Sequence, residues 1–148
     1  MAGILSKSCD YGIRATLYVT LQDPGEFVSI KKISEDLNIS FHFLTKILQK
    51  LTKNRILNSY RGPNGGVTLS KKASSITLEE IVVAIDGENL FQKCVLGLSE
   101  CQDDTQCPIH FQWKEIRQEI RNLFRTTTLS MLEERIVKDG FRIRDSLK

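Results

Sequence analysis

The chain has 148 residues, a net charge of +3 and a hydrophobic fraction of 41%, values that suit one globular domain with an appended helical arm. No apolar run approaches the ~20 residues of a membrane-spanning helix, and the N-terminus lacks the basic lead and long apolar block of a secretory signal. We therefore expect no membrane association and a cytoplasmic location, where thiols stay reduced.

Three helices are predicted in the first third of the chain. Apolar side chains recur at helical spacing over residues 8–22, and an Asp-Pro-Gly turn ends this helix. Ser29 can cap a second helix over residues 30–37, and Ser40 can cap a third over residues 41–56. Because a very short turn joins the second helix to the third, whose outer face carries cations, this order predicts a helix-turn-helix unit.

A β-hairpin is predicted directly after these helices. Two extended runs, at residues 57–60 and 67–70, flank the turn sequence Arg-Gly-Pro-Asn-Gly-Gly, which suits a tight hairpin tip. A hairpin in this place is a wing, and Arg61 at its tip could reach a minor groove or a phosphate. The predicted fold is therefore mainly α with a small β-hairpin, as a winged helix-turn-helix domain over residues 1–87.

The distribution of charge favours a nucleic-acid partner. Between Leu37 and Leu78 the chain has no Asp or Glu but seven Lys or Arg, so the remainder is mildly acidic. A basic segment of this kind binds a phosphate backbone well, because each neutralised phosphate releases condensed counterions. The alternative is a solvated basic face without a partner.

The second half of the chain predicts a loop and a helical arm. A capping box of Thr77 and Glu80 opens a helix that Gly87 ends, and the loop over residues 88–107 follows. A long helix is predicted over residues 108–125, with Pro108 in its first turn. Its apolar side chains form one stripe: Ile109, Trp113, Ile116, Ile120, Leu123 and Phe124.

This stripe predicts a two-fold homodimer, because a compact winged domain leaves little core for it to cover. One more short helix completes the predicted dimerisation segment, residues 108–137. The last residues, 138–148, are expected to form a flexible tail.

Three of the four cysteines, Cys94, Cys101 and Cys107, lie in one polar loop with the spacing C-x6-C-x5-C. A disulfide knot conflicts with a reducing compartment and leaves one thiol unpaired. Zinc prefers C-x2–4-C pairs, whereas iron–sulfur clusters accept thiolates at wider gaps. We favour an iron–sulfur cluster; zinc, redox-active thiols and incidental thiols stay open as alternatives.

A cluster with four ligands needs one donor besides these thiolates. His110 lies one helical turn after Cys107, so both side chains can point into one site. Asp10 and Cys9 lie on the first helix and could reach across, for example from the other subunit. A ligand other than cysteine shifts the cluster's potential and leaves a labile bond, which suits a sensor.

The sequence predicts no enzyme. It contains no Gly-rich phosphate loop, no nucleophile elbow and no His pair at metalloprotease spacing. An electron carrier could use an iron–sulfur cluster, but that function would leave the basic segment unexplained. The sequence therefore favours a DNA-binding regulator over an electron carrier.

Together these motifs resemble the Rrf-two family of winged-helix bacterial regulators, of the IscR, NsrR and RirA type. The resemblance covers nearly the whole chain and includes SKSCDYGIRATLYV, the wing SYRGPNGGVTLSK, TLEEIVVAIDG and three cysteines followed by CPIH. It implies a homodimeric transcriptional regulator, expected to be a repressor, on a near-palindromic site in double-stranded DNA. Its DNA affinity would respond to iron, redox or nitric oxide status.

The resemblance also implies roles for particular residues. The three loop cysteines would hold a 2Fe–2S or 4Fe–4S cluster, and the fourth ligand in relatives matches either His110 or Asp10 of the partner subunit. The first cysteine gap is six residues here and five in many relatives. Some relatives have Glu at the position of Thr45, so this chain is expected to have a different or relaxed preference for its DNA site. The positions that match the family's DNA-reading residues are Ser40, Thr45, Lys46, Ser59, Arg61 and Asn64.

Overall fold

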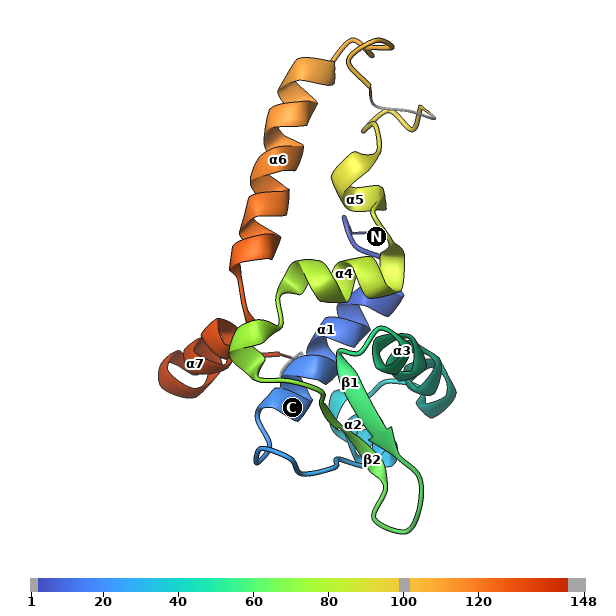
Figure 1. Cartoon of the computed structure of the whole chain (residues 1–148), viewed down its shortest axis with the longest axis vertical. Coiled ribbons are helices and arrows are strands. Elements are labelled where there is room, and N and C mark those ends of the chain that lie inside the picture. Colours follow the sequence, from blue (N-terminus) through green and yellow to red (C-terminus); the bar gives the residue numbers. More distant parts are fainter. Residues whose placement is uncertain (1–2, 99–101, 144–148) are drawn as a thin grey trace.

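The computed structural model describes residues 3–98 and 102–143, where the chain forms seven α-helices, one short 3-10 helix and a two-stranded sheet. In chain order the elements are α1 (Lys7–Thr20), α2 (Ile30–Leu37), α3 (Phe41–Lys53), β1 (Leu57–Tyr60), β2 (Gly66–Leu69), η1 (Ala73–Ser75), α4 (Leu78–Asp86), α5 (Asn89–Gln92), α6 (His110–Thr126) and α7 (Leu129–Asp139). Helices α1–α4 and the hairpin lie together, and α5, α6 and the described parts of the cysteine loop between them (residues 93–98 and 102–109) rise from them as an arm (Figure 1). None of the described helices is long and apolar enough to cross a membrane.

Local side-chain caps set the starts of several helices, as predicted. The Ser29 hydroxyl accepts a hydrogen bond from the Lys32 N–H at 3.1 Å at the start of α2. Thr77 and Glu80 form the predicted capping box at the start of α4. Each cap satisfies a backbone N–H that has no partner within its own helix.

Several helix ends differ from the prediction, and α1 ends at Thr20 rather than at residue 22. Helix α3 ends at Lys53 rather than at residue 56, because Arg55 takes a left-handed backbone conformation with φ of 61° and turns the chain into the hairpin. Helix α6 begins at His110, so Pro108 precedes the helix instead of lying in its first turn. The short elements η1 and α5 were not predicted, because each is a single turn with no periodic pattern of its own.

The hairpin is held to the helices by a third extended segment. Strands β1 and β2 pair antiparallel, with Leu57 opposite Leu69 and Tyr60 opposite Gly66. On the other side of β2, Val28 and Val67 exchange two backbone hydrogen bonds of 2.9 Å. The backbones approach so closely there that a Cβ on Gly66 would lie 2.0 Å from the Val28 oxygen.

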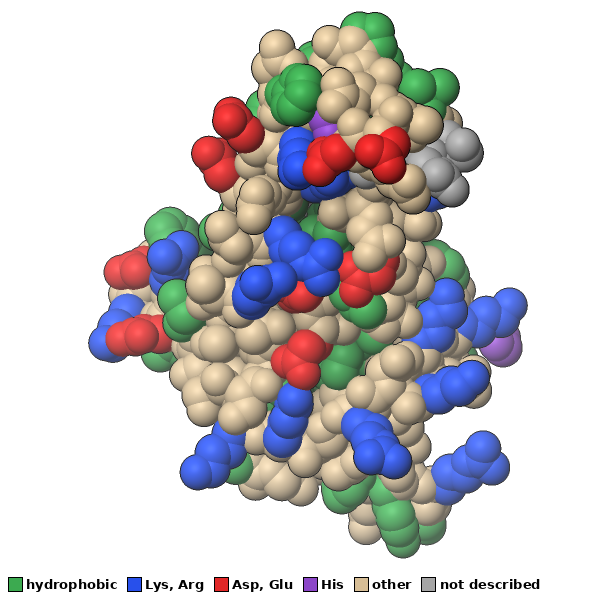
Figure 2. Space-filling model, turned by 45° about the horizontal axis from the view of Figure 1, so that its top comes forward, with side chains coloured by type: hydrophobic (Ala, Val, Ile, Leu, Met, Phe, Trp, Pro, Cys, Tyr) green, Lys and Arg blue, Asp and Glu red, His purple; other side chains and the backbone are tan. Residues whose placement is uncertain are grey.

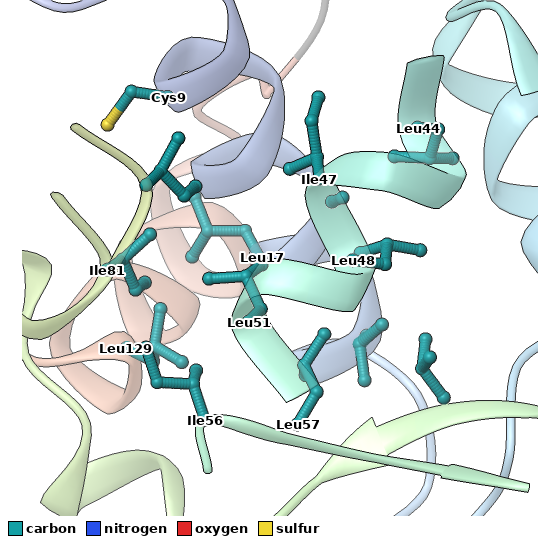
Figure 3. Close-up of a cluster of buried hydrophobic side chains, with 14 of the residues drawn as sticks. Cys9, Leu17, Leu44, Ile47, Leu48, Leu51, Ile56, Leu57, Ile81 and Leu129 are labelled. Atoms are coloured by element: carbon teal, nitrogen blue, oxygen red, sulfur yellow. The ribbon is translucent and has the colours of Figure 1, made fainter. Parts of the chain in front are cut away.

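Helix α1 forms the centre of the hydrophobic core, which includes residues from Cys9 on α1 to Leu129 on α7 (Figure 3). Helix α3 presents its apolar stripe to α1, as its sequence periodicity predicts. Leu129 at the start of α7 is fully buried and donates its N–H to the Ile76 oxygen at 2.9 Å. Helix α7 therefore packs on the winged domain rather than extending the arm (Figure 1). The buried stripe of α3 consists of Leu44, Ile47, Leu48 and Leu51.

Candidate DNA interface and thiol site

Cations cover one face of the molecule over α3 and the hairpin. Lys46, Lys50 and Lys53 are exposed on α3, and Arg61 is exposed at the hairpin tip. In Figure 2, Lys and Arg side chains occupy the lower right of the view, where α3 and the hairpin lie, with no described acidic side chain among them. This face has a positive potential that attracts nucleic acid phosphates.

A groove of about 730 Å³ separates α3 from the hairpin. Its two walls carry hydroxyl, amide and cationic side chains, which are the groups that contact phosphates and base edges in protein–DNA complexes. The polar side chains that line it are Ser29 and Lys31 near α2, Thr45, Gln49, Thr52 and Lys53 on α3, and Ser59, Tyr60 and Arg61 on the hairpin.

The structure brings three of the six predicted DNA-contacting residues into this groove, namely Thr45, Ser59 and Arg61. The other three, Ser40, Lys46 and Asn64, are exposed outside it. Ser40 occupies the N-cap position of α3, but its side chain makes no capping hydrogen bond, so the helix does not use its hydroxyl.

Sequence reasoning missed several groove residues. Gln49 and Lys53 follow Thr45 by one and two helical turns, so their spacing could have identified them. Lys31 lies on another helix and Tyr60 on the hairpin, and only the fold brings these two to the groove. Helix α2 therefore contributes to the candidate interface together with α3.

Two of the loop cysteines lie side by side at the base of the cysteine loop. Cys94 follows α5, Cys107 precedes α6, and both side chains are buried. The pKa of the Cys94 thiol is lowered, most of all by a hydrogen bond from the backbone N–H of Leu96. A hydrogen bond from the Cys107 thiol and the charge of Arg117 lower it further. Cys101, the third predicted ligand, lies outside the described residues.

His110 lies close to this thiol pair, at the first residue of α6. Its side chain is only 2% exposed, and the backbone N–H of His110 donates to the backbone oxygen of Cys107 at 3.0 Å. The ring Nε2 lies 3.0 Å from a carboxylate oxygen of Asp103, which also accepts a 2.8 Å hydrogen bond from Lys114 Nζ. Lys114 and, to a smaller extent, His110 lower the pKa of Asp103.

The two candidate ligands on α1 lie in the winged domain, below the arm. Cys9 is fully buried in the hydrophobic core. Burial, and then the nearby charges of Asp86 and Asp10, raise the pKa of the Cys9 thiol to about 12, which disfavours a thiolate. Asp10 is half-buried in the first turn. Within residues 3–98 and 102–143, no three Cys, His, Asp or Glu side chains are arranged to hold a metal.

The apolar stripe of α6 divides between two faces. Phe124 packs inward with its ring 6.0 Å from that of Phe91, so the prediction that placed it on an outward stripe was wrong. Ile109, Ile116 and Leu123 are exposed and recur every seven residues, which places them on one face of the helix. Phe124 follows the exposed Leu123 by one residue, and each residue of a helix is rotated by about 100° around the axis, so Phe124 faces inward.

An ion-pair network joins the arm to the winged domain. The Arg121 guanidinium on α6 contacts Glu79 and Glu88 near the two ends of α4, each at 3.2 Å, and lies 5.1 Å from the ring centre of Phe91. Arg125 adds a second contact to Glu79 at 3.2 Å. These contacts tie α6 to both ends of α4.

The sequence model of the Rrf2 family, described as an iron-dependent transcriptional regulator, matches residues 5–135. The chain belongs to the Rrf2 family. This Rrf2 protein is 33% identical over 128 residues to the HTH-type transcriptional regulator IscR of Escherichia coli O1:K1, a match that covers 86% of this chain and 78% of IscR. Family membership confirms the predicted winged fold and supports DNA binding and transcriptional regulation.

Solved structures agree with this assignment. CymR (YrzC), the global cysteine regulator of B. subtilis, superposes with a TM-score of 0.73 at 24% identity, over 90% of this chain and 98% of CymR. IscR of T. potens superposes with a TM-score of 0.71 at 19% identity, over 97% of this chain and 93% of that one. At these identities the comparison confirms the fold of the Rrf2 protein.

Proposed function

We propose that this protein regulates transcription, as a repressor, by binding a near-palindromic DNA site as a homodimer under the control of an iron–sulfur cluster. Cys94, Cys101 and Cys107 hold the cluster, of the 2Fe–2S or 4Fe–4S type. The observation that carries this proposal is the adjacent pair of thiols at Cys94 and Cys107, with the pKa of Cys94 lowered. Iron is bound by the thiolate form of cysteine, so these donors fit such a cluster.

The surroundings of His110 support it as the fourth ligand. Metal-ligating histidines commonly donate their second ring N–H to a carboxylate, and Asp103 lies at that distance from Nε2. Asp10 of the partner subunit is the competing donor, because this chain carries both residues.

The exposed face of α6 supports a homodimer. Ile109, Ile116 and Leu123 place an apolar side chain on one face at every second turn, and a second copy of the same helix can cover them with two-fold symmetry. Two-fold symmetry gives two copies of α3, which bind half-sites about one helical turn of DNA, ~34 Å, apart. The near-palindromic site follows from this symmetry.

The position of the cysteine loop supports control of DNA affinity. When bound, the cluster supplies a group that oxidants, nitric oxide or iron shortage can change or remove. The loop joins α5 to the start of α6, and Arg121 ties α6 to α4 of the winged domain. A change of ~1–3 kcal/mol in DNA affinity is enough to switch transcription.

The test is an anaerobic absorption spectrum with iron and sulfide assays on the wild type, Cys101→Ala and Cys9→Ala. We expect iron, sulfide and a visible charge-transfer band in the wild type and in the Cys9 variant, and their loss in the Cys101 variant. DNA affinity is then measured with and without the cluster, and His110→Ala is compared with Asp10→Ala. A colourless wild type after anaerobic reconstitution contradicts the cluster.

One observation favours a second function, that of a thiol-redox regulator of the same fold. Because Cys94 and Cys107 are adjacent, an oxidant could join them in a disulfide that ties α5 to α6. In that case the protein is colourless, diamide removes two free thiols, and DNA affinity changes with this oxidation alone. Zinc analysis of the same sample tests the zinc-bound alternative.

A further inference from the structure

Two side chains on α3 point to a definite base preference of the DNA site. We propose that Thr45 and Gln49 each read an A·T base pair in the major groove. The Thr45 methyl group contacts the methyl group of a thymine, and the Gln49 carboxamide forms two hydrogen bonds with an adenine. This inference rests on DNA binding by the winged domain and does not depend on the iron–sulfur cluster.

Gln49 lies where a base-reading side chain is needed. It is exposed on α3, on the side opposite the buried stripe that includes Leu44 and Leu51, and it lines the groove beside the hairpin. Lys46 and Lys53 lie three and four residues away on the same face, so cations flank the amide along the helix. Lysines in those positions can bind the phosphates of the groove that Gln49 enters.

The hydrogen bonding of Thr45 decides which group it offers to DNA. Its hydroxyl donates to the Phe41 oxygen of the preceding turn at 2.8 Å, so the hydroxyl hydrogen is committed to the helix. The hydroxyl can then only accept a hydrogen bond, and the γ-methyl group is the part of this groove-lining side chain that can make an apolar contact with a base. The natural apolar partner in a major groove is the C5-methyl group of thymine.

The chemistry of a carboxamide selects adenine for Gln49. An amide both donates and accepts, which matches the N7 acceptor and the N6 amino donor of adenine in one plane. Thr45 and Gln49 are one turn apart on the same side of α3, or ~6 Å along the axis. Base pairs are stacked ~3.4 Å apart, so the two side chains reach pairs separated by about two steps.

The first test is selection of binding sites from a DNA library with randomised half-sites, followed by titrations at fixed salt. We expect the wild type to prefer an A·T pair at two positions, by about tenfold over G·C at each. In Gln49→Ala one preference disappears and the other stays. In Gln49→Glu that position shifts toward C·G, because a carboxylate accepts from the cytosine amino group and repels adenine N7.

Two further variants separate the groups of Thr45. Thr45→Val keeps the methyl group and loses the hydroxyl, and we expect it to keep the thymine preference. Thr45→Ser keeps the hydroxyl and loses the methyl group, and we expect it to lose that preference. Lys53→Ala is the control for a phosphate contact, which weakens binding to all sequences alike and lowers the dependence on salt.

Several outcomes overturn the inference. If Gln49→Ala behaves like Lys53→Ala, or if the wild type binds DNA without an A·T preference, Gln49 does not read a base. If Thr45→Ser keeps the preference and Thr45→Val loses it, the hydroxyl is the reading group. In these cases the proposed function stands, whereas a wild type that binds no DNA with or without a cluster contradicts both.

Discussion

Replacing Arg121 with Met should lower the free energy of unfolding by about 2 kcal/mol, because Arg121 connects the arm to the winged domain. Its guanidinium pairs with Glu79 and Glu88 at 3.2 Å each and lies over the ring of Phe91. The Arg121 side chain is 28% exposed and that of Glu79 is 18% exposed. Methionine keeps most of the apolar contact and removes the charge.

The expected magnitude follows from this partial burial. Fully exposed ion pairs contribute ~0–1 kcal/mol, and breaking a fully buried pair costs ~3–5 kcal/mol. Arg121 forms two ion pairs of intermediate exposure and a cation–π contact of ~0.5–1 kcal/mol, so we expect its replacement to lower the free energy of unfolding by about 2 kcal/mol. Arg125→Met is the matched control: Arg125 is 58% exposed and contacts only the Glu79 end of the network, so we expect a loss below ~0.7 kcal/mol.

Urea unfolding at one fixed protein concentration measures both variants, since the stability of the proposed homodimer would depend on concentration. With an m-value of ~2 kcal/mol/M, the Arg121 variant should unfold at about 1 M less urea than the wild type. Equal midpoints for the two variants would refute the reasoning, because they would mean that the partly buried network contributes no more than one surface pair.

Three further predictions test other parts of the fold. Gly66→Ala should lower stability by ~1–3 kcal/mol and weaken DNA binding in a shift assay, because the new Cβ would lie 2.0 Å from the Val28 oxygen. Cys9 should resist iodoacetamide at pH 8 in native protein and react in urea, because it is fully buried and the pKa of its thiol is raised to about 12. Burial alone would raise the pKa of Glu80, but hydrogen bonds from Lys71 and from the Thr77 backbone N–H outweigh it and lower the pKa. Ionised Glu80 therefore contributes to the free energy of unfolding, by less than ~1 kcal/mol, at pH 7, and this contribution is lost as the pH falls below about 5. Glu80→Gln should flatten that part of the stability curve.

Local interactions made a large part of the fold predictable from the sequence. Ser29 and Thr77 cap their helices with their own side chains, and the stripe that includes Leu44 and Leu51 repeats at helical spacing. The Gly-rich turn sequence likewise indicated the hairpin. Each of these signals is contained in a few consecutive residues, so no knowledge of the rest of the chain was needed.

The candidate sites were predictable only in part. The family resemblance identified Thr45, and the predicted hairpin tip identified Arg61; the structure places both in one groove. Gln49 was missed, although it lies one helical turn after Thr45, because only the fold shows that this side of α3 faces the hairpin. For the thiols, spacing indicated a shared site, and the structure places Cys94 beside Cys107.

Only the tertiary structure decided how distant segments meet. Val28 pairs with Val67, Phe124 turns toward Phe91, and Arg121 reaches Glu79, across 39, 33 and 42 residues of chain respectively. The sequence by itself determined the helices, the wing and the cysteine loop, because short-range hydrogen bonds and periodicity encode them. The pairing of Val28 behind the wing and the inward face of α6 depend on the burial of apolar area between distant residues, and the position of the arm depends also on the ion pairs of Arg121; no local pattern records these contacts.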